Sequence, residues 1–423
     1  MHQAMVQENV IPGLSQKKVL RGCHLSMKNK LPGNLAGQPA SIWDEKYDES
    51  AMWKSKPRKK PLIQIVDSIL DMPGFQAPPT SRYRLIDWSS RNVIASAIQD
   101  LVTFFDTTAC ASVDSLDNVE ISNVCTLKWN NAGDKLVICT LSSAIKLYNV
   151  EVQKIVWTTK CKSEAAFATP CYVRCVCWSH DDQHIVAGCR GLITIYSAMT
   201  GRVVKSVLAH TTRVLALTFS SNYRYLASSA ADSTVRIFLW PTLDPGLDIT
   251  YIHPVKTLAW HPYESGLLCI GGGMRDGSLS LWNVNKFDIV SYRCVNFFAG
   301  VENLAWNKLS GELVVHWSYS DGYKQYTVMP VLASLDRIVD RLPVDKEMRI
   351  NYIMWNHDHT QLVHRKKLNQ LVLLLAVQSS EYLSMWNFFG NEYQYREKNR
   401  KRREVRESTS STNFKEFARF SIR

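Results

Sequence analysis

The sequence predicts an all-β protein, a seven-bladed β-propeller, from three observations. An apolar stretch ending in an aromatic residue recurs along the chain, its spacing is nearly even, and polar turns separate the copies. Seven aromatics end these stretches: Trp88, Trp129, Trp178, Phe219, Trp260, Trp306 and Trp355. They lie 41 to 49 residues apart, near the ~40 to 45 residues of a four-stranded WD-type blade.

Each unit carries further strand and turn signals after its first aromatic. A polar turn leads into a second apolar strand, and a third strand ends in another aromatic. These second aromatics are Phe105, Tyr148, Tyr196, Phe238, Trp282, Tyr326 and Trp386. Turn sequences such as NNAGDK and SHDDQ are rich in the residues that connect antiparallel strands. Seven such units can close into a ring that leaves no long sheet edge exposed.

The repeats divide the chain into three parts. Residues 62–390 are predicted to form a WD40-type propeller, because the pattern is confined to them. Residues 1–61 lack sustained periodicity and are expected to form a flexible N-terminal arm, and residues 391–423 a charged, then Ser/Thr-rich tail. The formal net charge is +12, and two basic tracts, Lys54 to Lys60 and Arg396 to Arg406, hold much of the excess. We interpret them as solvated flanks, with localisation or docking elements as the alternative.

The same residues exclude several classes of chemistry. The 11 cysteines fall mostly in strand-like runs and are expected to be core thiols, and no Cys-x-x-Cys or His/Cys spacing predicts a metal site. No GxSxG, HExxH, Walker or kinase motif occurs, so we expect neither catalysis nor a cofactor. The triple glycine at Gly271 to Gly273 lacks a following helix and is interpreted as a blade turn.

Two further expectations concern internal bonding and compartment. His210, Ser228 and Asp232 have the spacing of a buried hydrogen-bonded set with a structural role. The first residues are polar and no apolar run nears the ~20 residues of a membrane span. We therefore expect a cytoplasmic and nuclear protein that has no membrane partner.

Three longer stretches resemble the Fizzy and Fizzy-related family, the activators of the anaphase-promoting complex. They are SILDMPGF at 68–75, LIDWSSRNVIASAI at 85–98 and the glycine-containing blade HPVKTLAWHPYESGLLCIGGGMRDGSLSLWN at 253–283. Two docking motifs fit as well. Lys18, Val19, Leu20 and Arg21 resemble the family's KILR element, and Ile422 and Arg423 resemble its carboxy-terminal Ile-Arg tail. The resemblance implies that these residues attach the propeller to the complex.

The resemblance also implies a degron-binding site, with departures. Glu381 is similar to a family acid that reads the arginine of a destruction box, whereas the second acid position aligns with Thr80. Arg349 is similar to a family arginine that reads KEN-type degrons. Other polar family positions are altered here and read Ala231, Ser233 and Met274. No DRYIPxR sequence, the family's C-box, is found. A retained framework with these departures most resembles the insect cortex branch.

Two main function hypotheses remain open on sequence. In the first, the chain is a monomeric, non-enzymatic adaptor that brings degron-bearing substrates such as mitotic cyclins to the anaphase-promoting complex in the mitotic or meiotic cell cycle. In the second, it is a WD-repeat interaction scaffold in cell-cycle or developmental control that does not activate the ligase. A nucleic-acid-binding propeller is a third and weaker hypothesis, because the positive charge lies mainly outside the repeats.

Overall fold

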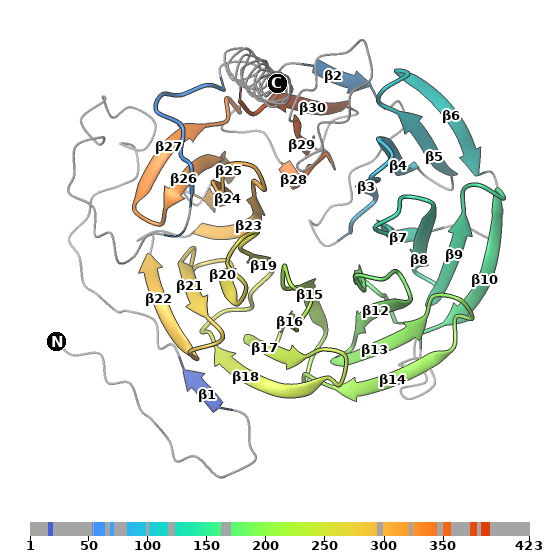
Figure 1. The fold of residues 1–423 in the computed structure, drawn as a ribbon, viewed down its shortest axis with the longest axis horizontal. Helices are drawn as coiled ribbons and strands as arrows, with labels where there is room; N and C mark the ends of the chain where they lie inside the picture. The colour runs from blue at the N-terminus through green and yellow to red at the C-terminus, as the bar shows by residue number, and fades with distance from the viewer. Residues whose placement is uncertain are drawn as a thin grey trace, which may run out of the picture.

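The computed structural model is a ring of seven β-sheets around a central opening (Figure 1). It describes residues 16–19, 53, 55–63, 68–71, 83–98, 101–116, 123–161, 171–293, 299–320, 325–344, 350–356, 373–378 and 382–389. Secondary structure in these ranges is all strand, from β1 to β30, without a helix. The same ranges therefore hold no helix with the length and apolarity needed to cross a membrane.

The first four sheets follow the chain in order, and each begins at its innermost strand. Blade 1 consists of β3 (Ile86–Trp88), β4 (Val93–Ile98), β5 (Leu101–Asp106) and β6 (Ala111–Leu116). Blade 2 consists of β7 (Val124–Trp129), β8 (Lys135–Thr140), β9 (Ala144–Asn149) and β10 (Lys154–Lys160). Blade 3 consists of β11 (Cys175–Trp178), β12 (His184–Cys189), β13 (Leu192–Ser197) and β14 (Val203–Leu208). Blade 4 consists of β15 (Val214–Phe219), β16 (Tyr225–Ala230), β17 (Thr234–Leu239) and β18 (Asp244–Thr250).

The last three sheets depart slightly from this plan. Blade 5 consists of β19 (Thr257–Trp260), β20 (Leu267–Gly271), β21 (Leu279–Asn283) and β22 (Asp288–Arg293). Blade 6 consists of β23 (Ala299–Trp306), β24 (Leu313–Ser320), β25 (Gln325–Val328), β26 (Pro330–Ser334) and β27 (Arg337–Arg341), and both β25 and β26 pair with β24. Blade 7 consists of β28 (Ile350–Trp355), β29 (Leu373–Gln378), β30 (Tyr382–Asn387) and β2 (Ser68–Asp71).

The seven aromatics that define the repeat all end the innermost strand of a blade, as the sequence predicts. Their large side chains pack between neighbouring blades, and the indole N–H of Trp178, for example, donates to the carbonyl of Lys128 in the preceding blade at 3.3 Å. The second strands are the most buried, because each sheet is covered on both faces by its neighbours. The outermost strands alternate between exposed and half-buried residues, as in β10.

A short polar turn follows the innermost strand and repeats its geometry from blade to blade. In blade 2 the carbonyl group of the Asn130 side chain accepts the backbone N–H groups of Asp134 and Lys135 at 3.0 and 2.9 Å. Ser179 and Ser220 use their hydroxyl groups in the same way in blades 3 and 4. Gly133 occupies the left-handed region in the first of these turns, with φ 73°. The expected turn chemistry is thus confirmed.

The ring closes through a strand from the beginning of the chain. β2 is the outermost strand of blade 7 and runs antiparallel to β30, with Ser68 opposite Met385 and Asp71 opposite Tyr382. The innermost strands β28 and β3 also lie beside each other, so blades 7 and 1 meet directly (Figure 1). The sequence predicts seven four-stranded units but does not show that the last one borrows its fourth strand.

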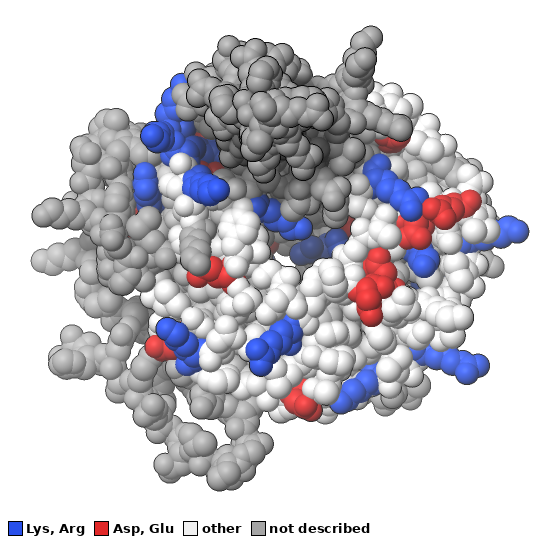
Figure 2. Space-filling view, viewed as in Figure 1, with Lys and Arg blue, Asp and Glu red and all other residues white. Residues whose placement is uncertain are grey.

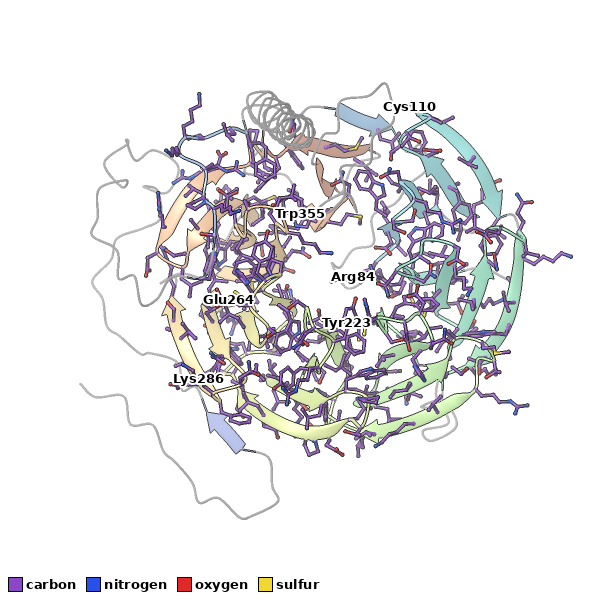
Figure 3. The ribbon with its side chains drawn as sticks, viewed as in Figure 1. Arg84, Cys110, Tyr223, Glu264, Lys286 and Trp355 are labelled. Atoms are coloured by element: carbon purple, nitrogen blue, oxygen red, sulfur yellow. The ribbon has the colours of Figure 1, made fainter. Side chains whose placement is uncertain are left out.

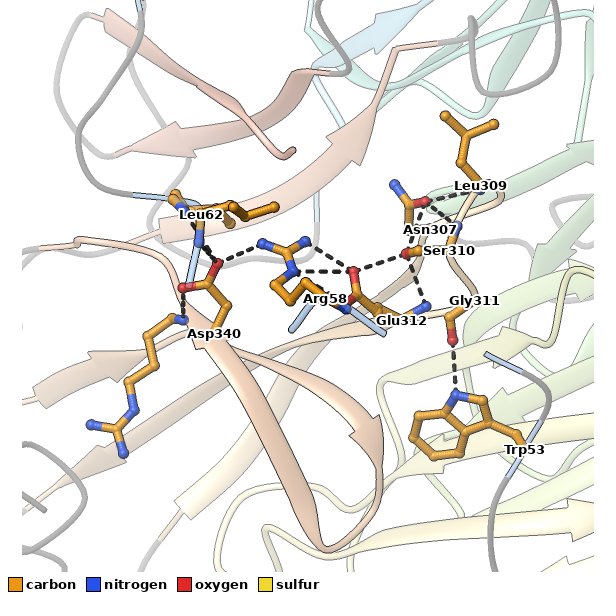
Figure 4. A network of polar contacts seen from close by, with 11 residues as sticks. Trp53, Arg58, Leu62, Asn307, Leu309, Ser310, Gly311, Glu312 and Asp340 are labelled. Carbon is orange, nitrogen blue, oxygen red and sulfur yellow. Dashed lines mark hydrogen bonds and ion pairs between the residues drawn. The ribbon is translucent and has the colours of Figure 1, made fainter. Parts of the chain in front are cut away.

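The basic tract that begins at Lys54 is not a solvated flank throughout, and this corrects the sequence interpretation. Arg58 is 7% exposed and lies over blade 6. Its guanidinium forms a two-pronged pair with Glu312, at 3.1 and 2.9 Å, and a third contact with Asp340 at 2.5 Å (Figure 4). It also stacks over the ring of Phe388, 4.1 Å from the centroid. Charge composition alone predicts a solvated tract, because it does not reveal a buried counter-charge far along the chain.

The residues around Arg58 are held by the same blade. The indole N–H of Trp53 donates to the Gly311 carbonyl at 2.8 Å (Figure 4). Its ring packs edge-on against Trp306. The N–H groups of Leu62 and Ile63 donate to the Asp340 carboxylate at 2.8 and 3.1 Å. Residues 55–63 therefore pack on the propeller, although the sequence assigns nearly all of them to a flexible arm.

Candidate functional site

The seam between the first and last blades has an apolar base. Ile86, Trp88 and Ile94 of blade 1 pack against Leu383 and Met385 of β30, and all five side chains are buried. Because two different blades supply these residues, the seam fixes the position of the β30 end relative to blade 1. The acid that the family resemblance assigns to a destruction box, Glu381, directly precedes β30 in the sequence.

Glu381, the acid predicted to contact a destruction box, lies just outside the described residues. Glu381 and Thr80 are outside them, and β30 begins at the next residue after Glu381. The pairing of β2 with β30 sets Asp71 opposite Tyr382. An acidic residue of β2 therefore occupies the same end of blade 7. Sequence reasoning missed Asp71, because only the borrowed strand brings it beside this end of β30.

The altered positions of the predicted KEN-type site lie on turns between the second and third strands of two blades. Ala231 and Ser233 belong to the β16–β17 turn, where the Ser233 carbonyl accepts the N–H of Tyr251 at 2.8 Å. Met274 lies on the β20–β21 turn and is 37% exposed. Arg349 lies outside the described residues, directly before β28. The described part of this mouth thus offers an alanine and a methionine where the family has polar groups.

The triple glycine forms part of the turn that carries Met274. A Cβ on Gly273 would stand 2.0 Å from the Pro254 carbonyl oxygen, and one on Gly272 would stand 2.4 Å from the Asp276 carboxylate. The N–H of Gly272 donates to the Ser278 carbonyl at 2.7 Å, so the segment closes a hairpin. Gly271 to Gly273 are thus a blade turn, as expected, and their backbone is packed too closely for side chains.

The first docking motif is partly described, and it lies on the edge of blade 4. β1 (Gln16–Val19) pairs in parallel with the outermost strand β18, with Lys18 opposite Ile249 and Val19 opposite Thr250. Figure 1 shows β1 outside β18 on the rim of the ring. Leu20 and Arg21 lie outside the described residues, as do Ile422 and Arg423. The roles of these residues stay predictions.

The predicted His210 set is formed, and its burial decides what it can do. His210 Nε2 is 2.8 Å from the Ser228 hydroxyl, and His210 Nδ1 is 3.3 Å from the Asp232 carboxylate. Burial raises the pKa of Asp232, but hydrogen bonds from His210 and Thr234 outweigh it and hold the pKa well below its usual range. Serine, histidine and acid resemble a hydrolytic triad. Ser228 is 0% exposed, however, so no substrate reaches the hydroxyl, and the set ties strands together.

A group of two half-buried side chains and one exposed tyrosine was not predicted. The guanidinium of Arg174 lies between two tyrosine rings, 5.5 Å from the centroid of Tyr83 and 5.6 Å from that of Tyr172. Tyr172 is 42% exposed. Arg84 follows Tyr83 and points toward the central opening (Figure 3). Tyrosine and arginine are over-represented among the residues that dominate protein interfaces, so this group extends the candidate binding surface of the ring.

Charges on the described surface are mixed. On the face in Figure 2, lysines and arginines are scattered among acidic and uncharged residues and do not form one continuous basic area. Several of the charged groups are paired, including Arg91 with Glu151 at 2.8 Å and Lys256 with Glu302 at 2.7 Å. This face therefore gives no support to the nucleic-acid hypothesis, which requires an extended basic surface.

Comparison with known proteins agrees with this geometry. The family model described as WD domain, G-beta repeat matches residues 161–197 and 201–238. A chain of the crystal structure of a mitotic checkpoint complex superposes with a TM-score of 0.65 at 22% identity, covering 81% of this chain and 98% of that one. The seven sheets and these matches establish the fold. The chain folds as a WD40-type propeller.

Proteins with similar sequences show which WD40-type propellers this chain is related to. Protein cortex of Heliconius melpomene is 23% identical over 346 residues, covering 80% of this chain and 74% of that protein. APC/C activator protein CDH1 of Saccharomyces cerevisiae is 27% identical over 270 residues, covering 63% of this chain and 44% of that protein. The homologues of this WD40 propeller thus include protein cortex and APC/C activators of the Cdh1, Fizzy-related and Cdc20 types. The resemblance drawn from its motifs is confirmed at this level.

Proposed function

We propose that this WD40 propeller is a non-enzymatic adaptor that brings degron-bearing substrates to the anaphase-promoting complex. The homology to APC/C activators, which covers 63% of this chain for CDH1 and 72% for Cell division cycle 20.4 of Arabidopsis thaliana, is the observation that carries the proposal. In this role the chain performs no bond chemistry. Its contribution is to raise the local concentration of a substrate beside the ligase, an effect that needs two simultaneous contacts.

Each contact is assigned to residues at a different part of the chain. Lys18, Val19, Leu20 and Arg21, together with Ile422 and Arg423, would dock on the complex. An arginine beside a free carboxylate offers a forked donor and an anion, and the isoleucine offers an apolar anchor. Mitotic cyclins are the expected class of substrate, the expected compartments are cytoplasm and nucleus, and one copy of the chain would act in each complex.

The degron contact is assigned to the seam of blades 1 and 7. Glu381 would pair with the arginine of a destruction box, and Arg349 would contact a KEN-type degron at the mouth. The pairing of β2 with β30 sets the backbone of Asp71 opposite Tyr382, the residue that follows Glu381 in the sequence. A single exposed ion pair contributes only about 0 to 1 kcal/mol, so the Glu381 contact alone would add little to degron affinity.

Co-purification tests the docking contacts. The intact chain and a version lacking Ile422 and Arg423 would each be expressed with an affinity tag and recovered from cell lysate. We expect subunits of the anaphase-promoting complex with the intact chain and at least a several-fold loss on deletion. Absence of the complex from both samples would contradict the adaptor proposal. A version with Cys110→Ser, which changes an exposed side chain in blade 1, serves as the control.

The second candidate function is an interaction scaffold that does not activate the ligase. It is favoured by the exposed Met274 and by Ala231 at the mouth, which replace polar family positions. A reconstituted ubiquitination reaction separates the two functions. If the chain binds both the complex and a cyclin fragment but does not increase cyclin ubiquitination, the scaffold function is the correct one. Increased ubiquitination that a Glu381→Gln change reduces would support the adaptor.

A further inference from the structure

Three buried cysteines that are scattered in the sequence meet between blades 2 and 3. Cys161 follows β10, Cys171 precedes β11, and Cys189 is the last residue of β12. Their Sγ atoms all lie within 4.8 Å of one another, and the residues are 4%, 1% and 4% exposed. The spacing along the chain predicts no metal site here, because no two of these cysteines form a Cys-x-x-Cys pair. Cys161 and Cys171 flank one connection, whereas Cys189 lies on strand β12.

The turn between β8 and β9 holds two of these cysteines in place through one serine. The Ser143 carbonyl accepts the N–H of Cys161 at 2.8 Å. The Ser143 hydroxyl accepts the N–H of Cys171 and donates to the Cys171 carbonyl, both at 2.9 Å. Ser143 is itself 1% exposed and has a left-handed backbone, with φ 65°. The two backbones are therefore fixed relative to each other by bonds outside the connection that joins them.

The surroundings are rich in sulfur, and the charges of Arg84 and Arg174 act on two of the neighbouring cysteines. Cys125 and Cys139 belong to the same buried cluster as the three cysteines. Burial raises the pKa of the Cys125 thiol to about 12, while the charge of Arg174 acts in the opposite direction. Burial also raises the pKa of the Cys175 thiol to about 12, and the charges of Arg84 and Arg174 act in the opposite direction. A guanidinium that acts on Cys125 and Cys175 can compensate part of the negative charge that would otherwise be costly in an apolar interior.

We propose that Cys161, Cys171 and Cys189 form a three-thiolate site for a single thiophilic d10 cation, either Zn²⁺ or Cu⁺. Thiolates prefer these ions among the common biological metals. A Zn–S bond of about 2.3 Å would place the sulfurs roughly 3.8 to 4 Å apart, so the cluster needs to contract only slightly. Binding releases one proton from each thiol, and the cation stabilises the thiolates inside the protein.

The site would join two blades. Cys161 and Cys171 lie at the two ends of the connection from β10 to β11, and Cys189 lies on the neighbouring strand β12. A metal bound to all three would tie that connection to blade 3, and it would stabilise the folded chain by an amount that rises with the logarithm of its affinity. The alternative is that the three thiols are only apolar packing groups, in which case no metal binds and no stability depends on one.

Metal titration of the intact chain tests the proposal. The reduced, metal-free protein would be titrated with Zn²⁺, and in a separate anaerobic experiment with Cu⁺, and bound metal measured by native mass spectrometry. We expect one ion per chain from at least one titration, and X-ray absorption should show about three sulfur neighbours near 2.3 Å. Preferential loading by one ion in competition identifies which cation the site takes.

Matched variants locate the site. Cys189→Ser should lower the affinity at least tenfold, whereas Cys269→Ser, which changes a buried cysteine on the equivalent strand of blade 5, should leave it unchanged. Ser143→Ala keeps all three thiols and loosens their support, so it should weaken binding while the far-ultraviolet circular dichroism stays native. This variant keeps the test valid if Cys189→Ser does not fold.

Three results would overturn the proposal. One is that neither ion binds the reduced chain with a stoichiometry near one. Another is that Cys189→Ser and Cys269→Ser bind equally well. The third is recovery of the chain from cells with a disulfide between Cys161 and Cys171, detected by peptide mapping after thiol alkylation, since that bond would consume two of the three ligands.

Discussion

Arg58 keeps two buried carboxylates from standing without a counter-charge. Glu312 and Asp340 are both nearly inaccessible, and each takes a hydrogen-bonded contact from the Arg58 guanidinium. Glu312 also accepts hydrogen bonds from the Ser310 hydroxyl at 2.9 Å and from the backbone N–H of Arg58 at 2.8 Å. Removing one partner from such a network leaves a charge in a low-dielectric environment, which costs far more than the pair itself contributes.

We predict that Arg58→Ala lowers the free energy of unfolding by about 3 to 5 kcal/mol. Urea denaturation followed by tryptophan fluorescence measures it. The control is Arg91→Ala, because Arg91 pairs with Glu151 in an exposed position, at 2.8 Å, and an exposed pair contributes about 0 to 1 kcal/mol. Equal effects of the two changes would mean that the Arg58 network is not buried in solution.

His316 makes the stability of the ring depend on mild acid. It is 1% exposed on β24, and burial lowers its pKa from the usual 6.5 to about 4. Between pH 6.5 and pH 4 the unfolded chain therefore binds a proton at His316 that the folded chain does not bind. The contribution of His316 to the stability of the fold is fully present above pH 6.5 and is lost as the pH falls toward 4.

We predict that His316→Gln flattens this dependence. Between pH 6.5 and pH 4 the wild-type chain should lose about 3 kcal/mol more of its unfolding free energy than the variant does. Denaturant midpoints at several pH values measure the difference. If the wild-type chain instead lost stability relative to the variant as the pH rose above 6.5, the prediction would be contradicted. His184→Gln is a suitable control, since that histidine is half-buried on β12 rather than enclosed.

At the scale of elements, the outermost strand of a blade is the edge to which a further strand can pair. An outermost strand has unpaired backbone groups along one side, and a short extended segment can hydrogen-bond to them. β1 does so on β18, over the pairs from Gln16 with Leu247 to Val19 with Thr250. Lys18 and Val19, half of the predicted docking motif, are thereby paired with the rim of blade 4. Binding of this motif to a partner would compete with the β1–β18 pairing.

We predict that replacing both Lys17 and Lys18 by proline releases β1 from the blade. Proline has no N–H to donate, and substituting two adjacent residues removes the donor whichever residue faces β18. Hydrogen exchange of the β18 amides should become faster between Leu247 and Thr250. Replacing the same two lysines by alanine keeps both N–H groups and should leave exchange unchanged; faster exchange in that variant would assign the effect to charge instead.

At the scale of the whole molecule, the ring is closed by pairing residues from its two ends. β2 supplies the outer strand of blade 7, and residues 55–63 brace blade 6. Non-local pairing of this kind makes the stability of the ring depend on a segment that precedes its first blade. Deleting that segment would leave β30 with an unpaired edge and would expose the apolar seam beneath it.

We predict different outcomes for two nested deletions. Removing residues 1–52 takes away β1 but keeps Trp53, Arg58 and β2, so the thermal midpoint should change by only a few degrees. Removing residues 1–72 takes away all three and should lower the midpoint by well over 10 °C or give insoluble protein. Similar midpoints for the two deletions would show that β2 is not needed to close the ring.

The sequence by itself determined the repeat, because a blade is a local unit. All seven predicted aromatics end innermost strands, the turns have the expected residues, and His210 meets Ser228 as its spacing indicates. Of the residues predicted to contact the complex or a degron, the structure describes only the backbone of Lys18 and Val19, so these roles stay predictions. Asp71 and the Tyr83, Arg174 and Tyr172 group emerged only in three dimensions.

Only the tertiary structure decided how the ring closes and which polar groups its interior holds. Arg58 is 254 residues from Glu312 and 282 from Asp340, so no local pattern connects them. The convergence of Cys161, Cys171 and Cys189 likewise depends on how one blade follows another. Periodicity reports the contacts that a residue makes within its own strand and turn, whereas burial of a charge or a cluster of sulfurs depends on segments that fold back from far along the chain.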